Sequence, residues 1–138
     1  QLARERLIQT HPELVNRIEC ASADMLDPAW GEFDHMVAMD SLIHYEQTDI
    51  VQALNGLSQR CRHSMVFTIA PRTPLLAVMH RVGRWFPRGD RSPSLEPIDP
   101  VRLSSDLRSG LHQGHWQQGR TLRVNRGFYI SQAWELHR

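Results

Sequence analysis

Apolar residues recur along the chain with two alternating periods, one typical of helices and one typical of strands. Residues 2–9 have an apolar face, which predicts a helix that ends before His11-Pro12. The segment 17–21 is interpreted as a short strand. The nearly continuous apolar run at 33–39 predicts a second strand, buried on both faces as in a parallel sheet.

The middle of the chain predicts a strand–helix–strand unit. Thr48 is the expected N-cap of a helix whose apolar positions Ile50, Leu54 and Leu57 recur at helical spacing. β-branched and aromatic residues at 64–70 then predict the strand that follows this helix. The two strands are therefore expected to be parallel, with a right-handed crossover between them.

The last part of the chain changes character. A helix is expected at 73–86, an exposed loop at 87–97 and a shorter helix at 100–111. No helical segment separates 116–124 from 127–136, so these two segments are expected to form an antiparallel pair. The sequence therefore predicts an α/β fold with a mostly parallel sheet that ends in an antiparallel carboxyl-terminal strand pair.

Composition narrows the class of protein. The chain has 138 residues, a formal net charge of +1 and 41% hydrophobic residues, which suits one globular domain and excludes disorder. No apolar run is long enough for a transmembrane segment. All 16 basic residues are Arg, but the nearly balanced charge predicts no nucleic-acid partner. The first residue is not Met, so the chain is expected to begin inside a longer sequence.

Cysteine usage predicts the compartment. Cys20 and Cys61 are too few for a disulfide scaffold, so a reducing, cytoplasmic environment is expected. Neither cysteine has the sequence context of a nucleophile, and both are interpreted as core residues. His112 and His115 lack the spacing to other ligands that a zinc site needs.

Candidate chemistry follows the predicted strands, because open α/β sheets bind ligands at the carboxyl ends of their strands. Asp24 and Met25 follow the first strand, and together they suit an adenine: the carboxylate would accept the exocyclic amine and the thioether would lie on the ring. The alternative for Asp24 is a turn-forming role. Arg72 follows the third strand, where it would bind a carboxylate.

The densest cluster of reactive groups runs from Asp40 to Tyr45, directly after the buried strand. His44 could act there as a general base or a metal ligand, with local packing and hydrogen bonding as the alternative. Arg88 and Arg91 could also clamp a carboxylate, with simple surface solvation as the alternative.

Four segments resemble the magnesium-protoporphyrin IX O-methyltransferase family, whose members use S-adenosylmethionine in chlorophyll and bacteriochlorophyll biosynthesis. They are FDHMVAMDSLIHY at 33–45, VFTIAPRTPLL at 66–76, FPRGDRSP at 86–93 and GFYISQA at 127–133. The resemblance covers nearly the whole chain, in order. It implies a Rossmann-like, seven-stranded methyltransferase sheet, of which residues 1–138 would be the carboxyl-terminal portion. The lid helix, the glycine-rich cofactor loop and the ribose-binding acid would then precede residue 1.

The resemblance also implies where S-adenosylmethionine, the co-substrate, would bind. Matched position by position, Ala23, Asp24 and Met25 correspond to the adenine-binding loop. Asp40 and Ser41 correspond to the strand end beside the methionine portion.

The same matching implies the substrate site. His44 and Tyr45 would be the catalytic pair facing the methyl group and the porphyrin, while Arg72, Arg88 and Arg91 would bind the porphyrin. The implied reaction methylates one propionate of magnesium protoporphyrin IX. The magnesium belongs to that substrate, so the resemblance implies no separate metal site in the protein. The porphyrin-binding subunit of magnesium chelatase is the implied protein partner, and peripheral association with photosynthetic membranes is implied as well. The chain alone is expected to be inactive.

Two other functions stay open from the residues themselves. A methyltransferase of the same fold that acts on another small acid or a quinone fits the strand-end chemistry equally well. A non-catalytic tetrapyrrole-binding module, with His44 as the ligand, is an interpretation from a different class.

Overall fold

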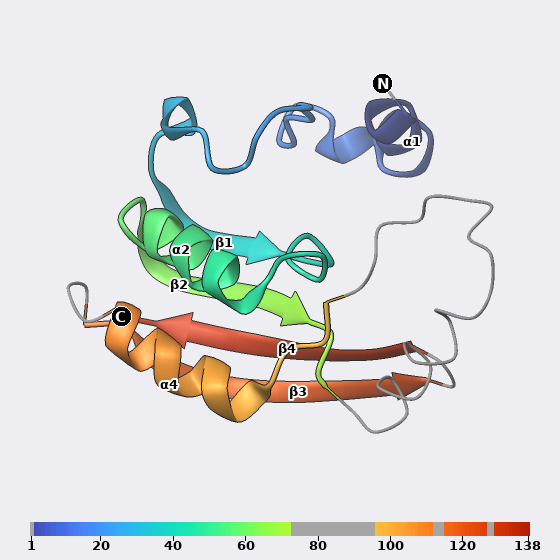
Figure 1. Ribbon diagram of the computed structural model, residues 1–138. Coiled ribbons are helices and arrows are strands. Elements are labelled where there is room, and N and C mark those ends of the chain that lie inside the picture. Colours follow the sequence, from blue (N-terminus) through green and yellow to red (C-terminus); the bar gives the residue numbers. More distant parts are fainter. Residues whose placement is uncertain (1, 73–95, 112–114, 127–128) are drawn as a thin grey trace. The chain divides into compact units, whose positions relative to one another are not determined.

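The computed structural model describes residues 2–72, 96–111, 115–126 and 129–138 of the chain (Figure 1). The chain divides into two units, Gln1–Trp30 and Gly31–Arg138. The predicted helix at 73–86 and most of the predicted loop at 87–97 lie outside the described residues.

The amino-terminal unit contains one helix and two single 3-10 turns. Helix α1 spans Leu2–Thr10, as predicted, and the two turns are Pro12–Leu14 and Pro28–Trp30. The prediction of a strand at 17–21 is wrong, because that segment forms a turn followed by irregular backbone. A five-residue segment becomes a strand only when a neighbour pairs with its backbone, and no described strand does so. Cys20 is consequently exposed, so its prediction as a core residue is also wrong.

A four-stranded mixed sheet organises the larger unit (Figure 1). Its strands are β1 (Phe33–Ala38), β2 (Cys61–Ile69), β3 (Gln117–Arg126) and β4 (Tyr129–His137), in the order β1-β2-β4-β3. Strands β1 and β2 are parallel, which confirms the predicted strand–helix–strand unit. The antiparallel β3–β4 pair is confirmed as well. Because β4 also runs antiparallel to β2, the described sheet is mixed rather than mostly parallel.

Two helices lie on the same face of this sheet (Figure 1). Helix α2 spans Gln47–Ser58 and connects β1 to β2, and helix α4 spans Pro100–Gly110 and precedes β3. The N-cap of α2 is Glu46 rather than the predicted Thr48, because the turn after β1 brings the chain into helical conformation earlier than the side-chain signal indicates. Asp99 caps α4 by accepting the Val101 N–H at 2.9 Å.

The core lies between the helices and the sheet. Phe67 and Trp134 stack with ring centroids 6.2 Å apart and an interplanar angle of 27°. Cys61 is 1% exposed, which confirms its prediction as a core residue. Other buried residues come from both helices and both central strands: Ile50, Leu54, Leu57, Met65, Ile69, Leu103, Leu107 and Leu136. None of the helices formed by the described residues is long and apolar enough to span a bilayer.

Candidate functional site

The parallel pairing of β1 and β2 brings two predicted site segments to one edge of the sheet. Ala38 at the end of β1 lies opposite Phe67 of β2, so both chains leave the sheet in the same direction. The loop from Asp40 to Tyr45 follows β1, and Arg72 follows β2. The sequence predicted this shared edge, since carboxyl ends of parallel strands meet.

Asp40 is held by one side chain of the neighbouring strand. Its backbone N–H donates to the Thr68 hydroxyl oxygen at 2.8 Å, and that hydroxyl donates to Asp40 Oδ1 at 3.2 Å. Thr68 is 4% exposed, whereas Asp40 is exposed. Asp40 also has φ of 52°, in the left-handed region that side chains with a Cβ seldom adopt.

The loop after Asp40 is anchored by its apolar residues. Leu42 is fully buried, and its carbonyl accepts the Tyr45 N–H at 3.1 Å. The Ile43 carbonyl accepts the Glu96 N–H at 3.0 Å, which joins the loop to the segment before α4. The backbone of this loop is therefore fixed at several points.

The polar side chains of the same loop face solvent. Ser41 is exposed and its hydroxyl donates to the Met39 carbonyl at 3.1 Å. His44 is exposed, and Tyr45 is half-buried. A fixed backbone with exposed carboxylate, hydroxyl and imidazole groups is suited to binding a polar ligand at this edge.

Arg72 has a fixed backbone and an exposed side chain. Its N–H donates to the Ile98 carbonyl at 2.7 Å, and the Ile98 N–H donates to the Ala70 carbonyl at 2.9 Å. These bonds continue the sheet beyond β2 by one parallel bridge between Pro71 and Ile98. The other two predicted porphyrin-binding arginines, Arg88 and Arg91, lie outside the described residues.

The predicted adenine-binding loop belongs to the amino-terminal unit. Asp24 Oδ1 accepts the Leu26 N–H at 2.9 Å, and the Asp24 carbonyl accepts the Trp30 Nε1–H at 3.1 Å. Ala23 is exposed and Met25 is half-buried. The carboxylate thus forms a turn, as the alternative interpretation expected, and adenine binding stays a prediction.

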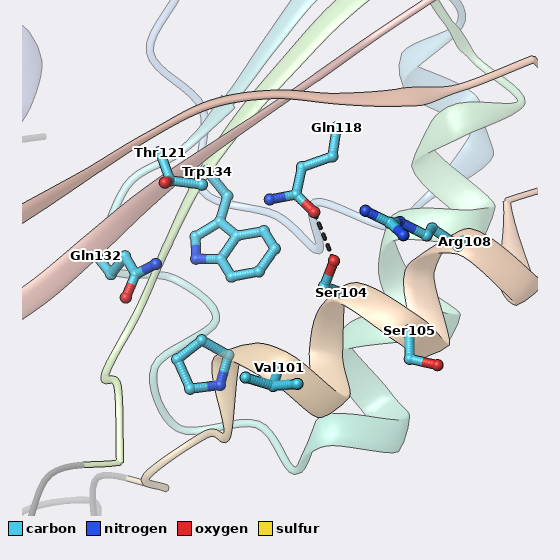
Figure 2. Close-up of a pocket in the computed structure, with 9 residues that line it drawn as sticks. Val101, Ser104, Ser105, Arg108, Gln118, Thr121, Gln132 and Trp134 are labelled. Carbon is cyan, nitrogen blue, oxygen red and sulfur yellow. Dashed lines mark hydrogen bonds between the residues drawn. The ribbon is translucent and has the colours of Figure 1, made fainter.

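A hollow of about 530 Å³ lies between α4 and the β3–β4 pair. Figure 2 shows side chains that line it. Ser104 points toward Gln118 across it, and their side chains share a hydrogen bond of 2.7 Å. Its lining residues are Pro100, Val101, Ser104, Ser105, Arg108, Gln118, Thr121, Gln132 and Trp134. None of these lining residues is a predicted site residue.

Two groups with shifted pKa values lie away from the predicted site. Hydrogen bonds to Glu32 and Asp34 raise the pKa of Arg62 at the amino end of β2. Hydrogen bonds from the backbone and side chain of Arg120 lower the pKa of Glu135 in β4. The described residues contain no group of three or more His, Cys, Asp or Glu side chains placed to hold a metal ion.

Thr68 is the residue that sequence reasoning missed. Its signal was a single hydroxyl in the apolar run from Val66 to Ala70, close to the carboxyl end of the strand. A buried polar side chain in such a run needs a hydrogen-bond partner. Close to the carboxyl end of a strand, that partner can be a residue of the ligand-binding edge.

Comparison with known sequences matches this chain to one protein family. The model of the magnesium-protoporphyrin IX methyltransferase C-terminus matches residues 38–138. Magnesium-protoporphyrin O-methyltransferase of Rhodobacter capsulatus is 40% identical over 134 residues, which are 97% of this chain and 55% of that protein. The Synechocystis protein of the same name is 26% identical over 108 residues, covering 78% of this chain and 45% of its own length. The chain spans about half the length of these relatives.

Comparison with solved structures supports the fold. The crystal structure of magnesium protoporphyrin IX methyltransferase (ChlM) from Synechocystis with bound SAH matches with a TM-score of 0.69 at 21% identity, over 97% of this chain and 60% of that one. The structure of the mitomycin 7-O-methyltransferase MmcR matches with a TM-score of 0.62 at 17% identity, over 99% of this chain and 38% of that one. The described sheet therefore corresponds to part of a methyltransferase fold.

Proposed function

The chain belongs to the magnesium-protoporphyrin IX methyltransferase family, and we propose that it is the carboxyl-terminal portion of an enzyme that methylates a propionate of magnesium protoporphyrin IX. The product would be the monomethyl ester, an intermediate of chlorophyll or bacteriochlorophyll biosynthesis. The observation that carries the proposal is the 40% identity to the Rhodobacter capsulatus enzyme over 97% of this chain. Under this proposal the described strands are part of a seven-stranded sheet.

The carboxyl edge of β1 and β2 has the chemistry to hold S-adenosylmethionine. Solved structures of the Synechocystis enzyme contain SAH or SAM. The methionine end of S-adenosylmethionine carries positive charge on its ammonium and sulfonium groups, which suits the exposed Asp40 carboxylate and the Ser41 hydroxyl. Ala23, Asp24 and Met25 would contact the adenine.

When bound, S-adenosylmethionine would supply an electrophilic methyl group for transfer to a carboxylate oxygen, with S-adenosylhomocysteine (SAH) as the leaving group. A propionate is already ionised at neutral pH, so the protein needs no strong general base. The exposed His44 would orient the propionate through an imidazole N–H, with Tyr45 beside it. Rate enhancement would come mainly from alignment of the reacting atoms.

Arginine side chains would hold the rest of the porphyrin. Arg72 is exposed at the same edge as His44, and its guanidinium can pair with a second porphyrin carboxylate through two parallel hydrogen bonds. Arg88 and Arg91 would add to this contact. The magnesium enters with the porphyrin, and the porphyrin-binding subunit of magnesium chelatase would deliver it, with the enzyme working in the cytoplasm or at the surface of photosynthetic membranes.

The experiment is a methyl-transfer assay with the full-length protein, methyl-labelled S-adenosylmethionine and magnesium protoporphyrin IX. We expect label in a porphyrin monoester. The matched control is the dimethyl ester of the same porphyrin, which has no free propionate and should take up no label. Porphyrin binding without transfer would favour a tetrapyrrole-binding module, and transfer only to a different acid or a quinone would favour another methyltransferase. Either result would contradict the proposal.

A further inference from the structure

The backbone ladder between β1 and β2 ends just before the proposed cofactor site. The last paired residues are Ala38 and Phe67. Beyond this pair, a side chain replaces the backbone as the hydrogen-bond acceptor. The Thr68 hydroxyl accepts the Asp40 N–H at 2.8 Å, where a backbone carbonyl would otherwise continue the ladder. A side chain thus controls how the chain leaves β1.

The same hydroxyl also holds the Asp40 carboxylate. It donates to Oδ1 at 3.2 Å, so one group contacts both the backbone and the side chain of a single residue. Asp40 has φ of 52°, a conformation that costs free energy for residues with a Cβ even though Asp adopts it more readily than most. The Thr68 hydroxyl accepts one hydrogen bond from Asp40 and donates another to it, and the two bonds help to offset that cost.

Threonine is well suited to this task. It is 4% exposed and lies between Phe67 and Ile69, both almost fully buried, so water cannot easily replace its hydroxyl. Its branched Cβ restricts rotation about χ1, which keeps the hydroxyl aimed at Asp40. A flexible polar side chain would hold Asp40 less precisely.

We propose that Thr68 is a positioning residue of the S-adenosylmethionine site and acts through Asp40. This inference rests on the proposed function, because it takes the Asp40 carboxylate as a group that pairs with the positive charge of the cofactor. Its consequence is specific: removing the Thr68 hydroxyl should weaken cofactor binding while leaving porphyrin binding nearly unchanged.

The test uses calorimetry on full-length variants. It measures the dissociation constants of magnesium protoporphyrin IX and of SAH, the product that S-adenosylmethionine leaves after methyl transfer. Thr68→Val keeps the shape but removes the hydroxyl, and we expect SAH to bind roughly tenfold more weakly. Thr68→Ser keeps the hydroxyl and should restore most of the affinity. Ser64→Ala is the matched control, since it removes the hydroxyl that contacts His35 Nδ1 at 2.8 Å near the other end of β2. Unchanged SAH affinity in Thr68→Val, or a Thr68→Ser variant as weak as it, would overturn the proposal.

A double-mutant cycle tests whether Thr68 acts through Asp40. The variant with both Asp40→Ala and Thr68→Val should bind SAH no more weakly than Asp40→Ala alone, and additive losses would contradict the mechanism. If Thr68→Val does not fold, hydrogen exchange of the Asp40 amide is measured in the parent protein instead. Slow exchange of this amide would support its hydrogen bond to the Thr68 hydroxyl, and exchange at the rate of an unprotected amide would overturn the proposal. A parent protein that binds no SAH would instead count against the proposed function itself.

Discussion

The two ends of the β1–β2 pair are held together in different ways. At the amino end, Arg62 of β2 pairs with Glu32 at 3.0 Å and with Asp34 at 3.3 Å, and the side chains of the Arg62–Glu32 pair are 59% and 61% exposed. At the carboxyl end, one buried hydroxyl, that of Thr68, makes two hydrogen bonds to Asp40.

The difference between exposed ion pairs and a buried hydroxyl indicates which end of a strand pair is better suited to a binding site. Exposed ion pairs exchange readily with water and salt, so they constrain geometry only loosely. A buried hydroxyl that loses its partner finds no substitute in water, and its contacts are therefore more strictly required. At the carboxyl end a buried hydroxyl fixes the backbone of Asp40, and a fixed backbone is what ligand alignment needs.

The largest effect should come from the buried half of β2. Phe67 is 1% exposed and stacks on Trp134, so Phe67→Ala should lower the free energy of unfolding by about 3–5 kcal/mol. Urea unfolding of the full-length protein measures this loss. Val66→Ala, which truncates a half-buried side chain on the same strand, is the control and should cost clearly less. Equal losses for the two variants would mean that packing against Trp134 contributes little.

Catalysis should depend on the carboxyl end and not on the amino end. His44→Ala should lower the turnover number by roughly a hundredfold, because the propionate is no longer aligned, while SAH affinity changes little. His63→Ala removes an exposed histidine at the amino end of β2 and should leave turnover unchanged. An unaltered turnover number in His44→Ala would remove this residue from the mechanism.

A smaller effect is expected outside the β1–β2 edge. Asp24 and Asp27 make the same kind of turn, since each accepts a backbone N–H through Oδ1 at 2.9 Å. If Asp24 also contacts the adenine, Asp24→Ala should weaken SAH binding by roughly tenfold in calorimetry, while Asp27→Ala should have almost no effect. Equal effects of the two substitutions would assign Asp24 to turn formation alone.

The smallest effect should come from the exposed ion pairs at the amino end. Hydrogen bonds to Glu32 and Asp34 raise the pKa of Arg62, so its charge does not change over the pH range of ordinary experiments. Arg62→Ala should leave the unfolding temperature and SAH affinity unchanged within error, at low and at high salt. A clear loss of stability would show that the two ends of the strand pair are more alike than their exposure suggests.

Local sequence signals were sufficient for most elements but not for their boundaries. The helix at Leu2–Thr10, the helix that follows Asp99 and the β3–β4 pair were predicted because periodicity and turn residues are properties of short segments. The start of α2 was misplaced, since Thr48 resembles an N-cap although the preceding turn fixes the boundary at Glu46. The strand predicted at 17–21 was wrong because strand formation depends on a partner that a segment does not carry.

The placement of the candidate residues along the sheet could be predicted from the sequence, but the contacts that hold them could not. Asp40 and His44 were chosen as candidates because they directly follow an apolar strand, and parallel topology places such residues at one edge. Their roles stay predictions. Thr68 was not found, because its contact with Asp40 joins positions 28 residues apart. No short-range pattern encodes that pairing.

The sequence by itself determined the helical and strand periods, the segments that carry polar chemistry and the resemblance to one family, since each of these depends on residues close together in the chain. Only the tertiary structure decided the mixed strand order, the left-handed conformation of Asp40 and the contact that stabilises it. The reason is that a hydrogen bond between neighbouring strands depends on register, and register is set by packing of the whole sheet against α2 and α4.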